Sequence, residues 1–401
     1  GKGANDDFTV SNAYGAITVN LGNARDDGMN VANLDNRNAS DNDIFGYHVT
    51  ANGGTGIDMV TLRGENDLIA NLFEGDDVVN IVSGTYTEYD ELNLSLGDDN
   101  DTVNLASNRL SYLGTDTIMG GDGDDKITAS NLYYIRDSGA FAGTSSVETV
   151  QLSGNTTWNF DGQTSGANAA GVMTYDFLSD MDTSLYLYNL ADGVTVNTVD
   201  TSDGGSSSYA RIDGTGSGTL NFASDIDGTD SNFYTFDVSD VNTLNVDATD
   251  SWVGIGSGIP TLRLGTPSGS GFRDRDYDSG DLTAVNLSGS AHIEMNRVDA
   301  RNLAEIRADQ AMMTDITLDL NNVADDIEVD TAEGDDTIWR DDASTNYDID
   351  TRGGNEIVGA GSMGDDNISL GDGEDNVYFA AGELETFDTL DGGLGNDTLT
   401  R

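Results

Sequence analysis

The sequence predicts an all-β chain, folded as a parallel β-solenoid with roll-like turns and β-helix-like segments, and three observations support this. No stretch of three or four turns carries apolar residues at helical spacing with a cap at each end. Short alternating runs, such as 17–22, 93–97 and 184–188, instead close on or pass into Gly, Asn or Asp. Two kinds of internal repeat then favour stacked turns over a sandwich.

Charge is the strongest feature of the composition. The 401 residues include 72 Asp+Glu and 17 Lys+Arg, for a formal net charge of −55. Such a chain repels phosphate backbones and acidic leaflets, so we expect no nucleic-acid partner and no binding to anionic membranes. Because 36% of the residues are hydrophobic, the charge does not indicate disorder. It predicts neutralisation of the folded state by a salt-rich environment or by bound cations.

Several classes of site and segment are excluded by absent residues. There is no Cys, which excludes disulfides and thiolate metal sites. The two His residues, His48 and His292, lie far apart in the sequence, so we do not expect a His-based zinc site or a Ser-His-Asp triad. No run of about 18 apolar residues exists, so we expect no transmembrane segment. The chain opens at Gly1 without Met or an apolar signal region, which we interpret as a fragment or a processed product.

The first repeat is a nonapeptide, Gly-Gly-x-Gly-x-Asp-x-U-x, in which U is a large apolar residue. Residues 53–61 match it at every position, and Asp58, Asp67 and Asp76 then follow at nine-residue spacing. Further complete or partial copies occupy 96–104, 114–118, 120–128, 334–338, 361–369, 370–378 and 392–400.

The second repeat, U-x-x-U-x-U, fills the middle of the chain. Its copies occupy 147–152, 241–246, 259–264, 282–287, 303–308 and 313–318. The starts at 241, 259, 282 and 303 fit a solenoid that turns once per roughly 20 residues. We therefore divide the chain into an N-terminal β segment (1–50), a first nonapeptide block (51–130), an irregular β-helical solenoid (131–324) and a second nonapeptide block (325–401).

The nonapeptide supplies the ligands that calcium prefers. Ca²⁺ takes 6–8 oxygen ligands, at roughly 2.3–2.6 Å, from carboxylates and backbone carbonyls. Glycines permit a tight turn in which carbonyls converge, the Asp at position six adds a carboxylate, and U starts an inward-facing strand. Because solenoid turns stack about 4.8 Å apart, a cation between two turns would be coordinated by both, which couples its binding to folding. The repeats therefore predict several bound Ca²⁺ ions.

These nonapeptides resemble the RTX (repeats-in-toxin) family, whose repeats form calcium-filled parallel β-rolls in secreted Gram-negative proteins. The resemblance covers about a third of the chain and implies ligation at Asp58, Asp125, Asp366, Asp375 and Asp397, with carbonyls from the preceding glycines. It also implies export without a cleaved N-terminal signal. The full set of candidate ligands, from complete and partial copies, is Gly53, Thr55, Gly56, Asp58, Asp67, Asp76, Asp77, Asp101, Asp116, Gly120, Asp122, Gly123, Asp125, Gly334, Asp336, Gly364, Asp366, Asp372, Gly373, Asp375, Asp388, Gly392, Gly395 and Asp397.

The wider layout is similar to calcium-dependent RTX surface-layer proteins of the Caulobacter type. Nonapeptide blocks are interrupted by U-x-x-U-x-U segments, with phrases such as 146–150 and 282–289. This resemblance implies a secreted structural protein at the extracellular cell surface that self-assembles into a surface layer or matrix. Calcium would order its turns and join acidic subunits into a homo-oligomer or lattice.

Two alternatives remain. One is an RTX adhesin fragment that binds a cell-surface glycan or a neighbouring cell, for which the charged cluster 273–278 and Trp158, Trp252 and Trp339 are candidates, although a solvated loop and core packing also explain them. The other is a polysaccharide lyase or epimerase with RTX modules. With 72 carboxylates, no Asp/Glu pair stands out as catalytic. We expect no enzyme activity.

Overall fold

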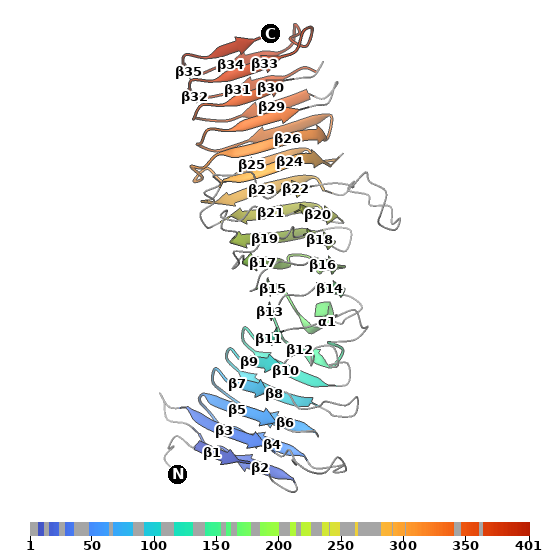
Figure 1. The fold of residues 1–401 in the computed structure, drawn as a ribbon, viewed down its shortest axis with the longest axis vertical. Helices are drawn as coiled ribbons and strands as arrows, with labels where there is room; N and C mark the ends of the chain where they lie inside the picture. Colours follow the sequence, from blue (N-terminus) through green and yellow to red (C-terminus); the bar gives the residue numbers. More distant parts are fainter. Residues whose placement is uncertain are drawn as a thin grey trace. The chain divides into compact units, whose positions relative to one another are not determined.

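The computed structural model is a parallel β-solenoid (Figure 1). It describes residues 7–11, 16–23, 29–35, 48–63, 67–82, 92–105, 116–130, 141–153, 158–161, 167–177, 185–199, 209–213, 218–225, 235–239, 241–248, 261–263, 282–290, 292–300, 302–340, 346–360 and 364–401. The chain forms two compact units, Gly1–Ser179 (unit 1) and Asp180–Arg401 (unit 2). Their boundary falls inside the segment 131–324 that composition marks as irregular.

Unit 1 alternates between two parallel sheets as the chain advances. Sheet I contains, in spatial order, β1 (Asp7–Val10), β3 (Asn30–Asp35), β5 (Asp58–Arg63), β7 (Val78–Ile81), β9 (Thr102–Leu105), β11 (Lys126–Ser130), β13 (Thr149–Ser153) and β15 (Thr174–Phe177). Sheet II contains β2 (Ile17–Asn20), β4 (Val49–Asn52), β6 (Leu68–Asn71), β8 (Leu92–Asp98), β10 (Thr117–Asp122) and β12 (Thr144–Ser145). The unit also contains β14 (Trp158–Asp161) and the four-residue helix α1 (Ala167–Ala170).

Unit 2 follows the same alternation. Sheet III contains β17 (Thr195–Val199), β19 (Thr219–Asp225), β21 (Thr243–Ala248), β23 (Ala284–Gly289), β25 (Glu305–Ala308), β27 (Asp326–Asp330), β29 (Asn346–Asp350), β31 (Asn367–Ser369) and β34 (Thr389–Asp391). Sheet IV contains β16 (Leu185–Tyr188), β18 (Tyr209–Asp213), β20 (Thr235–Ser239) and β22 (Thr261–Arg263). Sheet V contains β24 (Ile293–Asp299), β26 (Ile316–Asn322), β28 (Thr337–Arg340), β30 (Ile357–Ala360), β33 (Asn376–Phe379) and β36 (Thr398–Thr400). The short strands β32 (Asp372–Gly373) and β35 (Leu394–Gly395) lie in two successive turns and pair with each other.

The register is set by columns of identical or similar side chains. Leu34, Leu62, Ile81 and Leu105 lie directly opposite one another in neighbouring strands of sheet I, and all are buried. Each such side chain contributes about 1.5–3 kcal/mol on burial. A slip of one residue would turn every one of them to the outside, so the alternating sequence fixes the pairing.

Outside the core, side-chain amides form ladders of their own. In sheet III, Asn245 Nδ2 donates to Asn221 Oδ1 (2.7 Å), and Asn286 Nδ2 donates to Asn245 Oδ1 (2.8 Å). The all-β parallel solenoid predicted from the repeats is therefore confirmed. Among the described residues no helix is long and apolar enough to cross a membrane.

One detail of the predicted repeat step is wrong. Leu244 lies opposite Val285, so the copies at 241 and 282 are one turn apart, whereas Leu262 of the copy at 259 belongs to β22 in sheet IV. In the same way, Ile316 of the copy at 313 belongs to sheet V. The triplet of apolar residues marks a strand of either sheet, because the inward-facing pattern is the same in both.

Candidate metal sites

The first group of acidic residues lies where the chain enters the strands of sheet I. We call Asp58, Asp77, Asp101 and Asp125 the first ladder. They lie opposite one another at the starts of β5, β7, β9 and β11, 19, 24 and 24 residues apart. Successive turns of the solenoid therefore stack one carboxylate upon the next.

Main-chain donors hold one oxygen of each carboxylate in the ladder. The N–H of Asp58 donates to Oδ1 of Asp77 (2.7 Å), that of Asp77 to Oδ1 of Asp101 (2.8 Å), and that of Asp101 to Oδ1 of Asp125 (2.9 Å). At the end of the ladder, the N–H of Asp125 donates to Glu148 Oε2 (2.8 Å). Each turn thus positions the side chain of the next.

The second oxygen of the same carboxylates has no donor. Oδ2 of Asp77, Asp101 and Asp125 is buried without a hydrogen-bond partner, and these residues are at most 1% exposed. Burial, with a smaller contribution from neighbouring carboxylates, raises the pKa of Asp77 to about 8, of Asp101 to about 7 and of Asp125 to about 6. A buried carboxylate oxygen with no donor costs free energy unless a cation or a proton satisfies it.

Asp58, at the other end of the ladder, differs. Asn30 Nδ2 donates to Asp58 Oδ1 (2.6 Å), and the N–H of Gly54 donates to Oδ2 (2.9 Å). Both oxygens of Asp58 therefore have protein donors, although burial still raises its pKa. The neutral Asn30 ends the column of charges.

Glycine is required where the turns before these strands approach one another. Gly121 has φ of 134°, and a Cβ there would lie 1.6 Å from the carbonyl oxygen of Gly97 in the preceding turn. At Gly120 a Cβ would lie 2.2 Å from Asp125 Oδ2. These glycines let a carbonyl of the preceding turn and the unpartnered Oδ2 of Asp125 come close to the turn backbone, and carbonyl and carboxylate oxygens are the ligands of a hard cation.

A second, exposed column runs beside the first ladder. The N–H of Asn100 donates to Asp76 Oδ1 (3.0 Å), and the N–H of Asp124 donates to Asn100 Oδ1 (2.9 Å). Here the later turn donates to the earlier one, the reverse of the first ladder. Although Asp76 keeps the nine-residue spacing from Asp58, Asp77 takes the ladder position, because one solenoid step here is 19 residues.

Unit 2 contains an equivalent arrangement at the starts of β28, β30, β33 and β36. We call Asp336, Glu356, Asp375 and Asp397 the second ladder. The N–H of Glu356 donates to Asp375 Oδ1 (3.0 Å), and the N–H of Asp375 donates to Asp397 Oδ1 (3.3 Å). Asp336 Oδ1 accepts from the N–H of Ile316 (2.8 Å).

Unpartnered oxygens recur in the second ladder. They are Oδ2 of Asp336 and Asp375 and both carboxylate oxygens of Glu356. Burial is the main cause that raises the pKa of Asp336 to about 7 and of Glu356 to about 9, and for Glu356 the adjacent Asp375 carboxylate adds to it. Sequence reasoning missed Glu356 because its copy has Glu where the nonapeptide has Asp. The pair Gly353–Gly354, followed by an acid and Ile357, was the available signal.

The other candidate aspartates do not belong to either ladder. Asp67 forms a 2.8 Å contact with His48 Nδ1, and Asp116 Oδ1 accepts from the N–H of Leu92 (2.7 Å). Asp388 Oδ1 accepts from the N–H of Asp366 (3.1 Å), and both oxygens of Asp366 bind Arg340. The remaining candidates lie in or beside the turns that enter β5, β11, β28, β31, β33 and β36: Gly53, Thr55, Gly56, Gly120, Asp122, Gly123, Gly334, Gly364, Asp372, Gly373, Gly392 and Gly395.

The carboxylates alone do not enclose a metal. Within the described ranges, no group of three or more His, Cys, Asp or Glu side chains is placed to hold an ion. A hard cation in the ladders would therefore depend on turn carbonyls for most of its ligands. The unpartnered Oδ2 atoms and the close approach of the Gly97 carbonyl to Gly121 fit such oxygen-only coordination.

Other candidate features can be placed only in part. The cluster 273–278 and Trp252 lie outside the described residues, and Trp158 is in β14. Comparisons of the chain with models of protein families, with curated proteins and with solved structures gave no match. The class of protein is defined by the fold and its sites: the chain is a parallel β-solenoid with stacked, buried carboxylates at its turns.

Proposed function

We propose that this protein is a secreted calcium-binding structural protein of the RTX type that assembles at the cell surface into a layer or matrix. The observation that carries the proposal is the set of buried ladder oxygens without donors, three in the first ladder and four in the second. Ions with charge +2 would satisfy these oxygens and offset part of the formal charge of −55.

The two ladders give calcium a direct effect on folding. Asp77, Asp101 and Asp125 are stacked in consecutive turns, so their negative charges repel when all are ionised. Cation binding between turns would convert this repulsion into cross-linking of one turn to the next. The turns and the strands that follow them should then be ordered together.

The exposed acidic residues supply the second part of the proposal. Asp76, Asp99, Asp122 and Asp124 are exposed beside the first ladder and add charge to the surface. Two such surfaces repel until cations bridge them, so subunit association should need more calcium than the folding of one chain. The proposal assigns the protein no catalytic role.

Electron microscopy of negatively stained protein, with millimolar calcium and with EGTA, tests the assembly. Arrays or filaments that form in calcium and dissolve in EGTA support the proposal. A monomer under both conditions contradicts it. A variant with Asp77, Asp101 and Asp125 all changed to Asn tests the ordering of turns separately from the bridging of subunits. It should lose the ordering of its turns by calcium, although its exposed acidic residues are unchanged.

One observation favours the adhesin alternative. Trp339 of β28 and Tyr378 of β33 stack with ring centroids 6.2 Å apart, and they are 45% and 40% exposed. Gly359, between them in the register, leaves space for the indole, since a Cβ there would lie 2.2 Å from Trp339 Cε3. Such a pair can stack on a sugar ring. Saturable glycan binding by a non-assembling monomer, lost in Trp339→Ala, would favour this function.

A further inference from the structure

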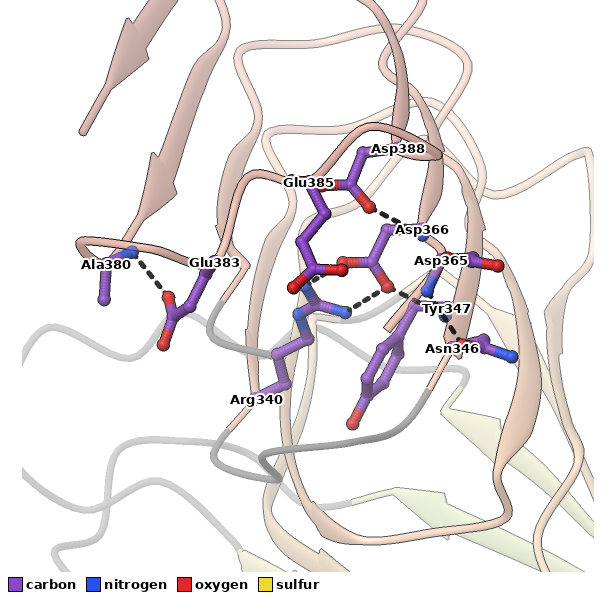
Figure 2. A network of polar contacts seen from close by, with 9 residues as sticks. All are labelled: Arg340, Asn346, Tyr347, Asp365, Asp366, Ala380, Glu383, Glu385 and Asp388. Atoms are coloured by element: carbon purple, nitrogen blue, oxygen red, sulfur yellow. Dashed lines mark hydrogen bonds and ion pairs between the residues drawn. The ribbon is translucent and has the colours of Figure 1, made fainter. Parts of the chain in front are cut away.

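Arg340 forms a fully buried ion pair with Asp366, one of the nonapeptide aspartates. Arg340 is the last residue of β28, and Asp366 immediately precedes β31 (Figure 2). Nη1 of Arg340 donates to Asp366 Oδ1 (2.9 Å), and Nη2 donates to Oδ2. Both side chains are 0% exposed. The contact is bidentate and uses both oxygens of the carboxylate.

The surroundings of Asp366 otherwise match those of a ladder carboxylate. The N–H of Tyr347, in the preceding turn, donates to Asp366 Oδ1 (3.1 Å), and the N–H of Asp366 donates to Asp388 Oδ1 (3.1 Å). The chain thus builds the same column of main-chain donors and carboxylates as in the ladders. The difference is the guanidinium of Arg340, which donates to both oxygens of Asp366, whereas Oδ2 of Asp101 has no donor.

The guanidinium is well held in this position. Its Cζ lies 4.1 Å from the ring centroid of Tyr347, which is itself buried, so the cation is stacked on an aromatic face. The planar fork of the guanidinium matches a carboxylate, so that two nitrogens can donate to its two oxygens at once. A metal ion could reach Asp366 only by displacing a buried guanidinium, which would then lack a counter-charge.

We propose that Arg340 is a built-in counter-cation that replaces a metal ion at Asp366, so that the turn entering β31 stays ordered without calcium. Asp366 is then not a calcium ligand, although its nonapeptide resembles the others. The contrast between this turn and the ladders, which are proposed to need calcium, rests on the proposed function. The order of the Asp366 turn itself depends on the contacts of Arg340.

Hydrogen exchange of the full chain, read by mass spectrometry in millimolar calcium and in EGTA, tests this inference. In the unchanged protein, peptides covering 346–350 and 364–369 should exchange at the same rate in both buffers. In Arg340→Met, exchange of these peptides in EGTA should rise by roughly 100-fold or more, because Asp366 is left buried without a counter-charge and without a donor to Oδ2. Calcium should restore protection in this variant, since Asp366 Oδ2 is then open to a divalent ion in the way proposed for the Oδ2 atoms of the ladders.

Two further variants serve as controls. Arg352→Met removes a pair of similar geometry, because Arg352 Nε and Nη2 donate to Asp330 Oδ1 and Oδ2 (3.0 Å each), but that pair is partly exposed. It should leave the 364–369 peptides unchanged. Arg340→Met combined with Asp366→Asn removes the charge together with its partner, and it should regain protection that does not depend on calcium.

The outcomes separate this inference from the proposed function. Loss of protection at 364–369 in EGTA in the unchanged protein, or an Arg340→Met variant indifferent to calcium, overturns it. If Arg340→Met does not fold in either buffer, the test rests on the other two proteins. The peptides covering 364–369 should then be protected without calcium both in the unchanged protein and in the double variant. If EGTA leaves both ladders protected while Arg340→Met still responds to calcium, the proposed function fails and the role of Arg340 stands.

Discussion

The main-chain N–H of Asp77 donates to Oδ1 of Asp101 one turn further along the solenoid, at 2.8 Å, and leaves Oδ2 of Asp101 buried without a donor. The backbone thus fixes the carboxylate and at the same time directs its second oxygen to a position where only a proton or a cation can satisfy it. This relationship makes the stability of unit 1 depend on what binds there.

Asp101→Asn should affect stability in opposite directions with and without calcium. Asn keeps the acceptor for the N–H of Asp77 but removes the buried charge. In EGTA at about pH 8, above both the ordinary pKa of 3.8 and the raised pKa of about 7, the folded state carries the cost of ionising Asp101, so the free energy of unfolding should rise on substitution, by up to about 4 kcal/mol for a pKa raised by about three units. In millimolar calcium it should fall, because a ligand is lost. Urea titrations in both buffers measure this, and Asp124→Asn, an exposed change in the neighbouring turn, is the control.

The pH dependence of the calcium-free protein has a definite sign. The folded-state pKa values of Asp77, Asp101, Asp336 and Glu356, about 8, 7, 7 and 9, lie above their ordinary values. Between about pH 4 and pH 9 the folded state therefore binds more protons than the unfolded state, and the free energy of unfolding falls as pH rises. Below about pH 4 these groups are protonated in both states, so their contribution to the free energy of unfolding is at its most favourable and no longer changes with pH.

Thermal unfolding in EGTA at several pH values between about 5 and 9 measures this slope. Saturating calcium should flatten it, because the ion holds the carboxylates ionised. A calcium-free protein that becomes more stable toward pH 9 would show that the ladder carboxylates are not held in the buried, donor-poor state described above.

Close stacking of the turns makes one glycine much less replaceable than another. Gly121→Ala should destabilise the protein by about 2 kcal/mol or more, because the residue has φ of 134° and its Cβ would overlap the carbonyl oxygen of Gly97. Gly171→Ala is the matched control: φ is 95°, but a Cβ there meets nothing within 4 Å. It should cost only the strain of the backbone. Equal effects in denaturant would argue against stacking at Gly121.

The sequence predicts the fold because most of its strands repeat the same alternation, as β3, β5 and β7 do. It locates Asp58, Asp101, Asp125 and Asp375 because their copies keep Asp at position six. It names both Asp76 and Asp77 but does not separate them, because the solenoid step of 19 residues is not a strict multiple of nine. It cannot find Glu356 by a rule that requires Asp. Likewise, the pairing of Arg340 with Asp366 spans 26 residues and depends on how one turn packs on the next, so no local motif records it.

The most direct test of the account is the calcium content of the ladders. After dialysis against millimolar calcium, the unchanged protein should retain several ions per chain by elemental analysis. The variant with Asp77, Asp101 and Asp125 changed to Asn should retain fewer, and its amides at 58–63, 78–81 and 102–105 should exchange equally fast with and without calcium. Equal calcium content in the two proteins, or no retained calcium in either, would contradict the assignment of the ladders as calcium sites.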